Sequence, residues 1–337
     1  MKVLAGDVGG SKTVLMTADV HGRTIDTIVE RRFPSPHYDS FTAILDEFLE
    51  DTPAGEHHNV CFAVAGPITE HTTGIQEAAV TNLPWKISTH DLCERYGFQQ
   101  VRLINDFTAV GYGIDALTEH DLAFLQNTTI QPHGNRAILG AGTGLGMAQM
   151  IWTGSGYTVL PSEGGHCDFA AIDHHSQGLW SYLHREWTHV SYDRIVSGPG
   201  IRRIFDYYVE THRLHGDAWV KSIQSSDDPA AAISQAAESV EIAAEVMKTF
   251  VRLYGAEAGN LALLTLPKGG LYIAGGIAPK ILSWLKTPYF IESFRAKGRM
   301  SALVARFPVM VITDTRVGLK GAALHAATEA VSTPTEL

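Results

Sequence analysis

The chain has 337 residues, of which 45% are hydrophobic and 18% charged, and its formal net charge is -10. This composition is typical of a soluble globular protein and excludes an intrinsically disordered chain. The negative charge disfavours binding to nucleic acid or to an anionic membrane surface. At about 100–200 residues per domain, the length predicts about two domains.

The three cysteines, Cys61, Cys93 and Cys167, are widely spaced and form no CxxC pair. We therefore expect neither a disulfide framework nor a zinc cluster, and a reducing compartment fits best. The first residues do not have the pattern of a signal peptide, and no uncharged apolar run approaches the ~18 residues of a membrane span. We expect a cytoplasmic protein with no membrane and no nucleic-acid partner.

The first part of the chain predicts three strands followed by alternating helices and strands. The strands are expected over residues 2–9, 13–20 and 23–33, and the short Gly-rich turn between the first two indicates a hairpin. Helical spacing of apolar residues predicts a helix over 40–51. The remaining elements are a buried strand that begins at Asn59 and is stopped by Gly66 and Pro67, a capped helix over 88–97, a strand over 100–107 and a helix that begins near Phe107.

The section from residue 135 onward repeats this order. Residues 135–152 are typical of a strand, a Gly-rich turn and a second strand. A mostly helical section is expected from Gln177 to Pro267, with its longest periodic piece over 238–264. A strand over 270–277, further helices, a strand over 308–314 and a helix over 318–330 follow. We therefore predict two similar α/β domains with a boundary near residue 115, and a last helix that packs back on the first domain.

Three glycine-rich turns follow predicted strands, at residues 6–13, 140–146 and 274–279. Glycines let backbone N–H groups approach an anion without an intervening side chain. One such turn is most often a plain tight turn. Three in one chain, two of them in hairpins that open the two predicted domains, favour phosphate binding.

Two familiar phosphate-binding motifs are excluded because the sequence does not match their consensus patterns. In the first turn Ser11 stands where the P-loop requires its second glycine, and a strand rather than a helix is expected to follow. The Rossmann fingerprint fails because its last position is Leu145 or Met147 rather than a small residue. Lys12 is therefore interpreted as a solvated side chain rather than as a catalytic lysine.

Asp7 lies inside the first turn, where its carboxylate would repel a bare phosphate. Its position is explained if a cation stands between the two. The alternative is that Asp7 hydrogen-bonds its own turn.

Two further groups of polar residues follow predicted strands. Asn105 and Asp106 end the buried strand over 100–107, a position where catalytic residues are held rigidly yet exposed; the alternative is that Asp106 caps the next helix. Glu163 and His166 flank two glycines in a loop suited to fold over a small ligand, although isolated residues of these types are more often surface groups. Asp193 precedes a Ser-Gly-Pro-Gly stretch that predicts a helix starting at Ile201, and it could reach a ligand or cap a helix.

Seven motifs occur together in the order and spacing of a known family. The sequence resembles the bacterial ATP-dependent glucokinases, which belong to the hexokinase–actin–heat-shock-ATPase superfamily. The related ROK-type sugar kinases carry a Cys-rich motif similar to CxxGxxGCxE, which this chain lacks, so the non-ROK group is favoured. The motifs are GDVGGSKT, LINDFTAVGYGI, GAGTGLG, PSEGGHCDF, HVSYDRIVSGPG, AGGIAPK and GLKGAAL.

The resemblance implies two similar actin-like, ribonuclease H-like α/β domains with an active-site cleft between them. A small domain would comprise residues 1–116 plus 314–337, and a large domain residues 117–313. The implied reaction is phosphorylation of glucose by ATP with Mg²⁺, and similar glucokinases are often homodimers.

The resemblance also assigns site residues. Asp106 matches the catalytic base that receives the proton of the sugar's primary hydroxyl, and Asn105 its sugar-binding neighbour. Glu163, His166 and Asp193 match further sugar contacts. Asp7 would hold the metal through water. The implied nucleotide-binding positions are Asp7, Gly9, Gly10, Ser11, Thr13, Gly142, Thr143, Gly144, Gly275 and Gly276.

One departure from the resembled family affects the sugar site. Similar glucokinases usually carry Glu where this chain has Asp193, which is one methylene shorter. The sequence therefore leaves open a kinase of another hexose or of an amino sugar. A non-catalytic sugar-sensing regulator of the same fold is less favoured, because Asp7, Asp106 and all three glycine turns are present.

Overall fold

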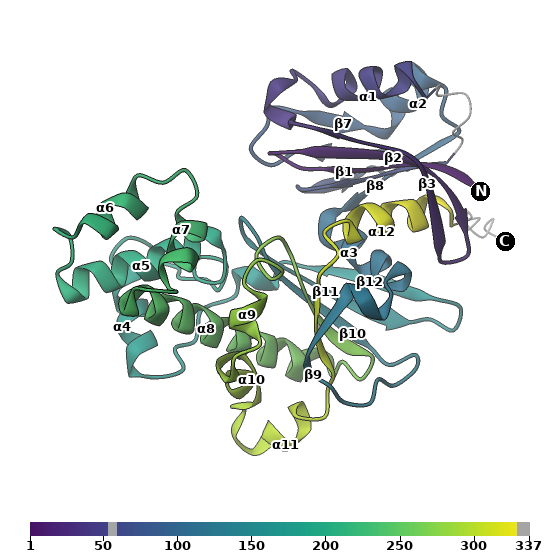
Figure 1. The fold of residues 1–337 in the computed structure, drawn as a ribbon. Coiled ribbons are helices and arrows are strands. Elements are labelled where there is room, and N and C mark those ends of the chain that lie inside the picture. The colour runs from purple at the N-terminus through teal and green to yellow at the C-terminus, as the bar shows by residue number, and fades with distance from the viewer. Residues whose placement is uncertain (53–58, 329–337) are drawn as a thin grey trace. The chain divides into compact units, whose positions relative to one another are not determined.

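The computed structural model describes residues 1–52 and 59–328, in which the chain forms two compact units. The first unit comprises Met1–Thr118 and the segment that begins at Arg316, and the second comprises Glu119–Thr315. Each unit combines sheet and helices (Figure 1), which confirms the predicted α/β fold class. Within the described ranges, no helix has both the length and the apolar character that crossing a membrane requires.

The first unit is built on a five-stranded sheet with the order β3-β2-β1-β4-β8. Strands β1 and β2 pair antiparallel, which confirms the predicted hairpin, whereas β1, β4 and β8 run parallel. A three-stranded sheet, β5-β6-β7, was not predicted. The strands are β1 (Lys2–Val8), β2 (Thr13–His21), β3 (Thr24–Phe33), β4 (Asn59–Val64), β5 (Ile68–Glu70), β6 (Gln76–Ala79), β7 (Lys86–Ser88) and β8 (Gln100–Asn105).

Helices cover both faces of this sheet (Figure 1). Side chains alternate between the faces of a strand. Leu4 and Val8 of β1 accordingly pack in one core cluster with α1, whereas Val3 and Ala5 pack in another with α3 and α12. The helices are α1 (Phe41–Glu50), α2 (Thr89–Tyr96), α3 (Asp106–Gly113) and α12 (Val317–Ala326).

The last helix packs on the first unit, as predicted, and glycines allow its close approach to α3. A Cβ atom on Gly321 of α12 would collide with the carbonyl oxygen of Ala109, and one on Gly113 of α3 would collide with that of Val317. The two helices therefore meet backbone against backbone at the middle and at the end of α3.

The second unit repeats the same arrangement around a six-stranded sheet with the order β12-β11-β10-β13-β14-β9. Its β10–β11 and β11–β12 pairs are antiparallel and its β10–β13 and β13–β14 pairs parallel, as in the first unit. An antiparallel edge strand, β9, was not predicted. The strands are β9 (Leu122–Gln126), β10 (Arg136–Ala141), β11 (Leu145–Trp152), β12 (Tyr157–Ser162), β13 (Gly270–Ala274) and β14 (Val309–Ile312).

The long helix α8 is the centre of this unit's core. It spans 25 residues and packs against α5, α10 and β10. Its Tyr254 hydroxyl is buried and accepts a hydrogen bond from the N–H of Ala141, so the helix supports the end of β10. The helices are α4 (His174–Leu183), α5 (Gly198–His212), α6 (Ala218–Gln224), α7 (Pro229–Ala236), α8 (Glu241–Thr265), α9 (Leu282–Leu285), α10 (Pro288–Arg295) and α11 (Ser301–Val304).

One predicted helix boundary was wrong. Helix α5 begins at Gly198 rather than Ile201, because the Ser197 side chain caps it by accepting from the N–H of Gly200 and Pro199 is compatible with a first turn. The buried strand that begins at Asn59 ends at Val64, before Gly66 and Pro67, as predicted.

Candidate active site

The first unit brings Asp7 and Asp106 to the same side of its sheet. Alternation along β1 places Asp7 on the face of Val3 and Ala5, which α3 and α12 cover. Asp106 is the first residue of α3. The start of α12 is also close, since a Cβ atom on Gly318 would lie 3.9 Å from Oδ2 of Asp7. The positive end of this helix therefore lies beside a carboxylate.

Asn105 and Asp106 share one backbone donor at the start of α3. The N–H of Phe107 donates to Oδ1 of Asn105 and to Oδ1 of Asp106, both at 2.9 Å. Asn105 is therefore the helix cap, and the alternative in which Asp106 is the cap is wrong. The bond from Phe107 helps to orient the Asp106 carboxylate.

The two carboxyl groups both have raised pKa values. Burial raises the pKa of Asp106 to about 6; the Phe107 N–H opposes this rise and the negative charge of Asp7 adds to it. Burial likewise raises the pKa of Asp7, against the charge of Lys12. Each carboxylate is thus destabilised in its charged form, and a cation bound beside them would relieve that cost.

The turn between β1 and β2 is held by local hydrogen bonds. Gly9 N–H donates to the Lys12 carbonyl (3.0 Å), and the Ser35 hydroxyl donates to the Gly9 carbonyl (2.7 Å). The Thr13 hydroxyl is fully buried and bonds to Ser35 Oγ, so the structure uses it to stabilise the turn. Its role as a phosphate contact stays a prediction.

Backbone donors remain at the tip of this turn. Among the described residues, the N–H groups of Gly10 and Ser11 have no hydrogen-bond partner. Gly10 lies against the chain at Thr81, because a Cβ atom on it would be 2.5 Å from the Thr81 carbonyl oxygen. Such free N–H groups on a tight turn are suited to an anion.

The corresponding turn of the second unit, Gly142–Gly144, is joined to the start of α5. Gly142 N–H donates to the Gly144 carbonyl (2.8 Å), and Gly198 N–H, at the first residue of α5, donates to the Gly142 carbonyl (2.9 Å). Within the described part of the chain, the N–H groups of Thr143 and Gly144 have no partner. A helix N-terminus beside free turn amides favours a bound phosphate.

The third glycine turn lies next to the second. Gly275 has a φ of 83°, in the left-handed region, and a Cβ atom on it would collide with the carbonyl oxygen of Ala141. Ile277 N–H donates to the same carbonyl at 3.3 Å. Gly276, by contrast, faces open space. Two of the three predicted phosphate turns are therefore neighbours in one unit.

The loop with Glu163 and His166 also belongs to this part of the second unit. Both side chains are exposed, and Nε2 of His166 lies 3.8 Å from Oε2 of Glu163. Asp193 lies beside the loop, since its N–H donates to the Gly165 carbonyl at 2.8 Å. The structure thus gathers Asp7, Asn105 and Asp106 in the first unit, and the other predicted sugar residues with two phosphate turns in the second.

Sequence reasoning missed two residues that shape these sites. Ser35 holds the first turn, and Gly318 adjoins Asp7. The Ser-Gly-Pro-Gly stretch, by contrast, did signal the start of the helix that Ser197 caps and that meets Gly142. Its nearness to a turn more than 50 residues earlier is a tertiary fact that no local pattern contains.

Comparison with known proteins identifies the family. The family model described as glucokinase matches residues 4–329. The chain belongs to the glucokinase family. It is 40% identical to the glucokinase of Nostoc sp. strain PCC 7120, over 96% of this chain and 98% of that protein.

Solved structures agree with this membership. The crystal structure of a glucokinase from an Antarctic psychrotroph matches with a TM-score of 0.83 and 30% identity, covering 96% of this chain and 98% of that one. A ROK family glucokinase from Streptomyces griseus, in complex with glucose and AMPPNP, has a TM-score of 0.61 at 18% identity and covers 96% and 98%. The latter likeness concerns the fold alone.

The donor set of this glucokinase-family chain fits Mg²⁺ bound chiefly by phosphate oxygens and water. Among the described residues, no group of three or more His, Cys, Asp or Glu side chains could hold a metal. Asp7 can contribute a single carboxylate. Mg²⁺ in nucleotide sites is commonly held by one or two carboxylates together with substrate phosphates and water.

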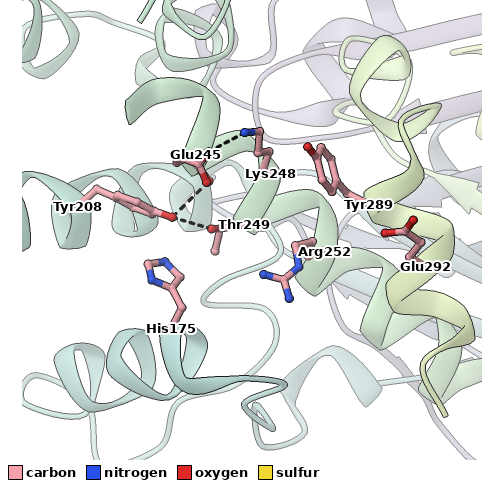
Figure 2. Close-up of a pocket in the computed structure, with 8 residues that line it drawn as sticks. All are labelled: His175, Tyr208, Glu245, Lys248, Thr249, Arg252, Tyr289 and Glu292. Carbon is pink, nitrogen blue, oxygen red and sulfur yellow. Dashed lines mark hydrogen bonds and ion pairs between the residues drawn. The ribbon is translucent and has the colours of Figure 1, made fainter. Parts of the chain in front are cut away.

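A pocket of about 420 Å³ lies between helices of the second unit (Figure 2) and contains none of the predicted site residues. Lys248 pairs with Glu245, and Arg252 pairs with Asp173 at 2.6 Å. Both cations are therefore neutralised within the unit, and the lining selects no single class of ligand. The lining residues are His175, Tyr208, Glu245, Lys248, Thr249, Arg252, Tyr289 and Glu292.

Proposed function

We propose that this chain transfers the γ-phosphoryl group of ATP to the primary hydroxyl of glucose, giving glucose 6-phosphate. The proposal depends chiefly on the environment of Asp106. Its carboxylate lies at the start of α3, accepts a hydrogen bond from the Phe107 N–H, and has its pKa raised to about 6 by burial. A base with a pKa near the working pH is the most efficient. Membership of the glucokinase family supports the substrate and the reaction.

In this proposal Asp106 accepts the proton of the sugar hydroxyl, and Asn105, Glu163, His166 and Asp193 contact the other hydroxyls. The free amides of the Gly9–Thr13 and Gly142–Gly144 turns bind phosphate oxygens, and Gly275 and Gly276 contact the adenosine. Asp7 would hold Mg²⁺. When bound, Mg²⁺ neutralises charge that develops on the phosphates.

The domain bounds, the localisation and the oligomeric state are also proposals. We assign a small domain to residues 1–116 plus 314–337 and a large domain to residues 117–313. We further propose a cytoplasmic homodimer without nucleic-acid or membrane partners.

The test is a coupled assay of ADP release with glucose, mannose, fructose and N-acetylated hexoses, each with Mg²⁺ and with excess EDTA. We expect turnover on glucose with Mg²⁺ and loss of turnover in EDTA. Faster turnover on another sugar would favour a kinase of another hexose or of an amino sugar, the alternative that the short side chain of Asp193 supports. Absence of turnover on every sugar would contradict both kinase functions and favour a sugar-sensing regulator.

The pH dependence of kcat/KM is expected to fall on the acid side with an apparent pKa near 6. Asp106 must be deprotonated to accept a proton, and its pKa is about 6 in the folded protein, so activity is present above this pH and is lost as the pH falls through it. Initial rates at subsaturating glucose between pH 4.5 and 8.5 measure the profile. Activity regained on return to pH 7.5 excludes acid unfolding, and a constant rate down to pH 4.5 would contradict the assignment.

A further inference from the structure

Asp193 is hydrogen-bonded to two different loops of the second unit. Its backbone N–H donates to the carbonyl of Gly165, in the loop with Glu163 and His166, at 2.8 Å. Its side-chain Oδ1 accepts from the N–H of Leu145, directly after the Gly142–Gly144 turn, at 2.7 Å. One half-buried residue therefore connects the proposed sugar loop with the proposed phosphate turn.

The three segments are in close contact. A Cβ atom on Gly144 would lie 2.5 Å from Oδ1 of Asp193, and one on Gly165 would collide with the carbonyl oxygen of Leu145. Glycine at both positions is what permits this approach. A movement of the Asp193 carboxylate would therefore displace the chain at Gly144 and Leu145, and with it the Glu163–His166 loop that contacts Leu145 through Gly165.

The segment that carries Asp193 is itself anchored to the core. The N–H of Tyr192 donates to the Cys167 carbonyl (3.1 Å), and its buried hydroxyl accepts from Nδ2 of Asn260 on α8 (3.1 Å). Asp193 thus projects from a fixed backbone, and its bond to Leu145 has a defined geometry.

We propose that Asp193 is a positioning residue that fixes the Gly142–Gly144 turn against the Glu163–His166 loop and so sets the direction of the free Thr143 and Gly144 amides. The inference rests on the proposed function, in which those amides bind nucleotide phosphate. With Oδ1 committed to Leu145, Oδ2 is the oxygen left for a sugar hydroxyl. A residue that contacted only sugar would have no effect on nucleotide binding when sugar is absent.

The test measures binding of AMPPNP with Mg²⁺ to the sugar-free protein by titration calorimetry. Asp193→Ala removes the acceptor of the Leu145 N–H, and we expect affinity to fall about tenfold, the effect of losing one hydrogen bond to a charged group. Asp193→Asn keeps an acceptor oxygen and is expected to recover affinity to within about threefold of the wild type. Asp168→Ala is the matched control, because Asp168 is an exposed carboxylate of the same region that pairs with His189 instead.

The outcomes separate this inference from the proposed function. Wild-type nucleotide affinity in Asp193→Ala, with only the KM for glucose raised, would overturn the positioning role and leave the kinase intact. A wild-type protein that does not bind AMPPNP would overturn both. If Asp193→Ala does not fold, as judged by its thermal melt, Gly144→Ala displaces the same Oδ1 while keeping the carboxylate, and unchanged affinity in that variant would refute the inference.

Discussion

Asp106→Asn is expected to lower kcat by about 10²–10⁴-fold while glucose binding is retained. The amide has nearly the same shape and its oxygen can still accept from the Phe107 N–H, so the start of α3 is kept. It cannot take a proton from the sugar hydroxyl at neutral pH. The coupled assay measures kcat, and calorimetry with glucose measures binding. Asp19→Asn, on β2 of the same sheet, is the control and should retain activity.

The same substitution should stabilise the protein at neutral pH. Because the pKa of Asp106 is raised to about 6 from its ordinary 3.8, the folded state binds the proton more tightly than the unfolded state. Stability is therefore lost as the pH rises between these two values, and the penalty is fully present above 6. Asparagine carries no charge and removes this penalty. The Tm of Asp106→Asn should therefore exceed that of the wild type most above pH 6, and the difference should vanish below about pH 4. Near-wild-type turnover in a folded variant would refute the role of Asp106 as base.

Gly275→Ala is expected to weaken nucleotide binding about tenfold or more and to lower the free energy of unfolding by about 1–3 kcal/mol. The left-handed backbone is strained for any residue with a Cβ, and the added methyl group collides with the Ala141 carbonyl oxygen. Relief requires the Gly275 turn to move away from the end of β10, where the Gly142–Gly144 turn begins. Denaturant unfolding and AMPPNP titration measure the two effects.

Gly276→Ala is the matched control for this strain. Gly276 faces open space and has an ordinary φ, so its substitution should leave the free energy of unfolding unchanged. Any loss of AMPPNP affinity in that variant then reports contact with the nucleotide itself. Equal unfolding free energies for Gly275→Ala and the wild type would contradict the proposed strain.

The sequence predicted the fold well where local patterns are sufficient. The apolar alternation and the glycines at residues 2–20 and 135–152 specify two hairpins, and the parallel strands after them follow from buried runs separated by helices. The short strands of the β5-β6-β7 sheet and β9 were not predicted. β5 and β7 have three residues each, too few to display a period.

The resemblance supplied the residues of the candidate site, among them Asp7, Asp106 and Asp193, but not the contacts that these residues make. Alternation along β1 places Asp7 on the side of the sheet that is covered by α3, the helix that begins at Asp106. The bond of Asp193 to Leu145 joins residues 48 positions apart, and no spacing rule predicts it. The burial of the Thr13 hydroxyl against Ser35 is equally invisible in the turn sequence.

The sequence by itself determined the order of the longer strands and helices, the two glycine hairpins and the family, because these depend on residue types and spacing along the chain. The tertiary structure alone decided the raised pKa of Asp106, the meeting of α5 with Gly142 and the double attachment of Asp193. Burial and hydrogen bonding depend on which distant segments pack together. A local pattern fixes which side of a strand a residue occupies, but not the neighbour that it finds there.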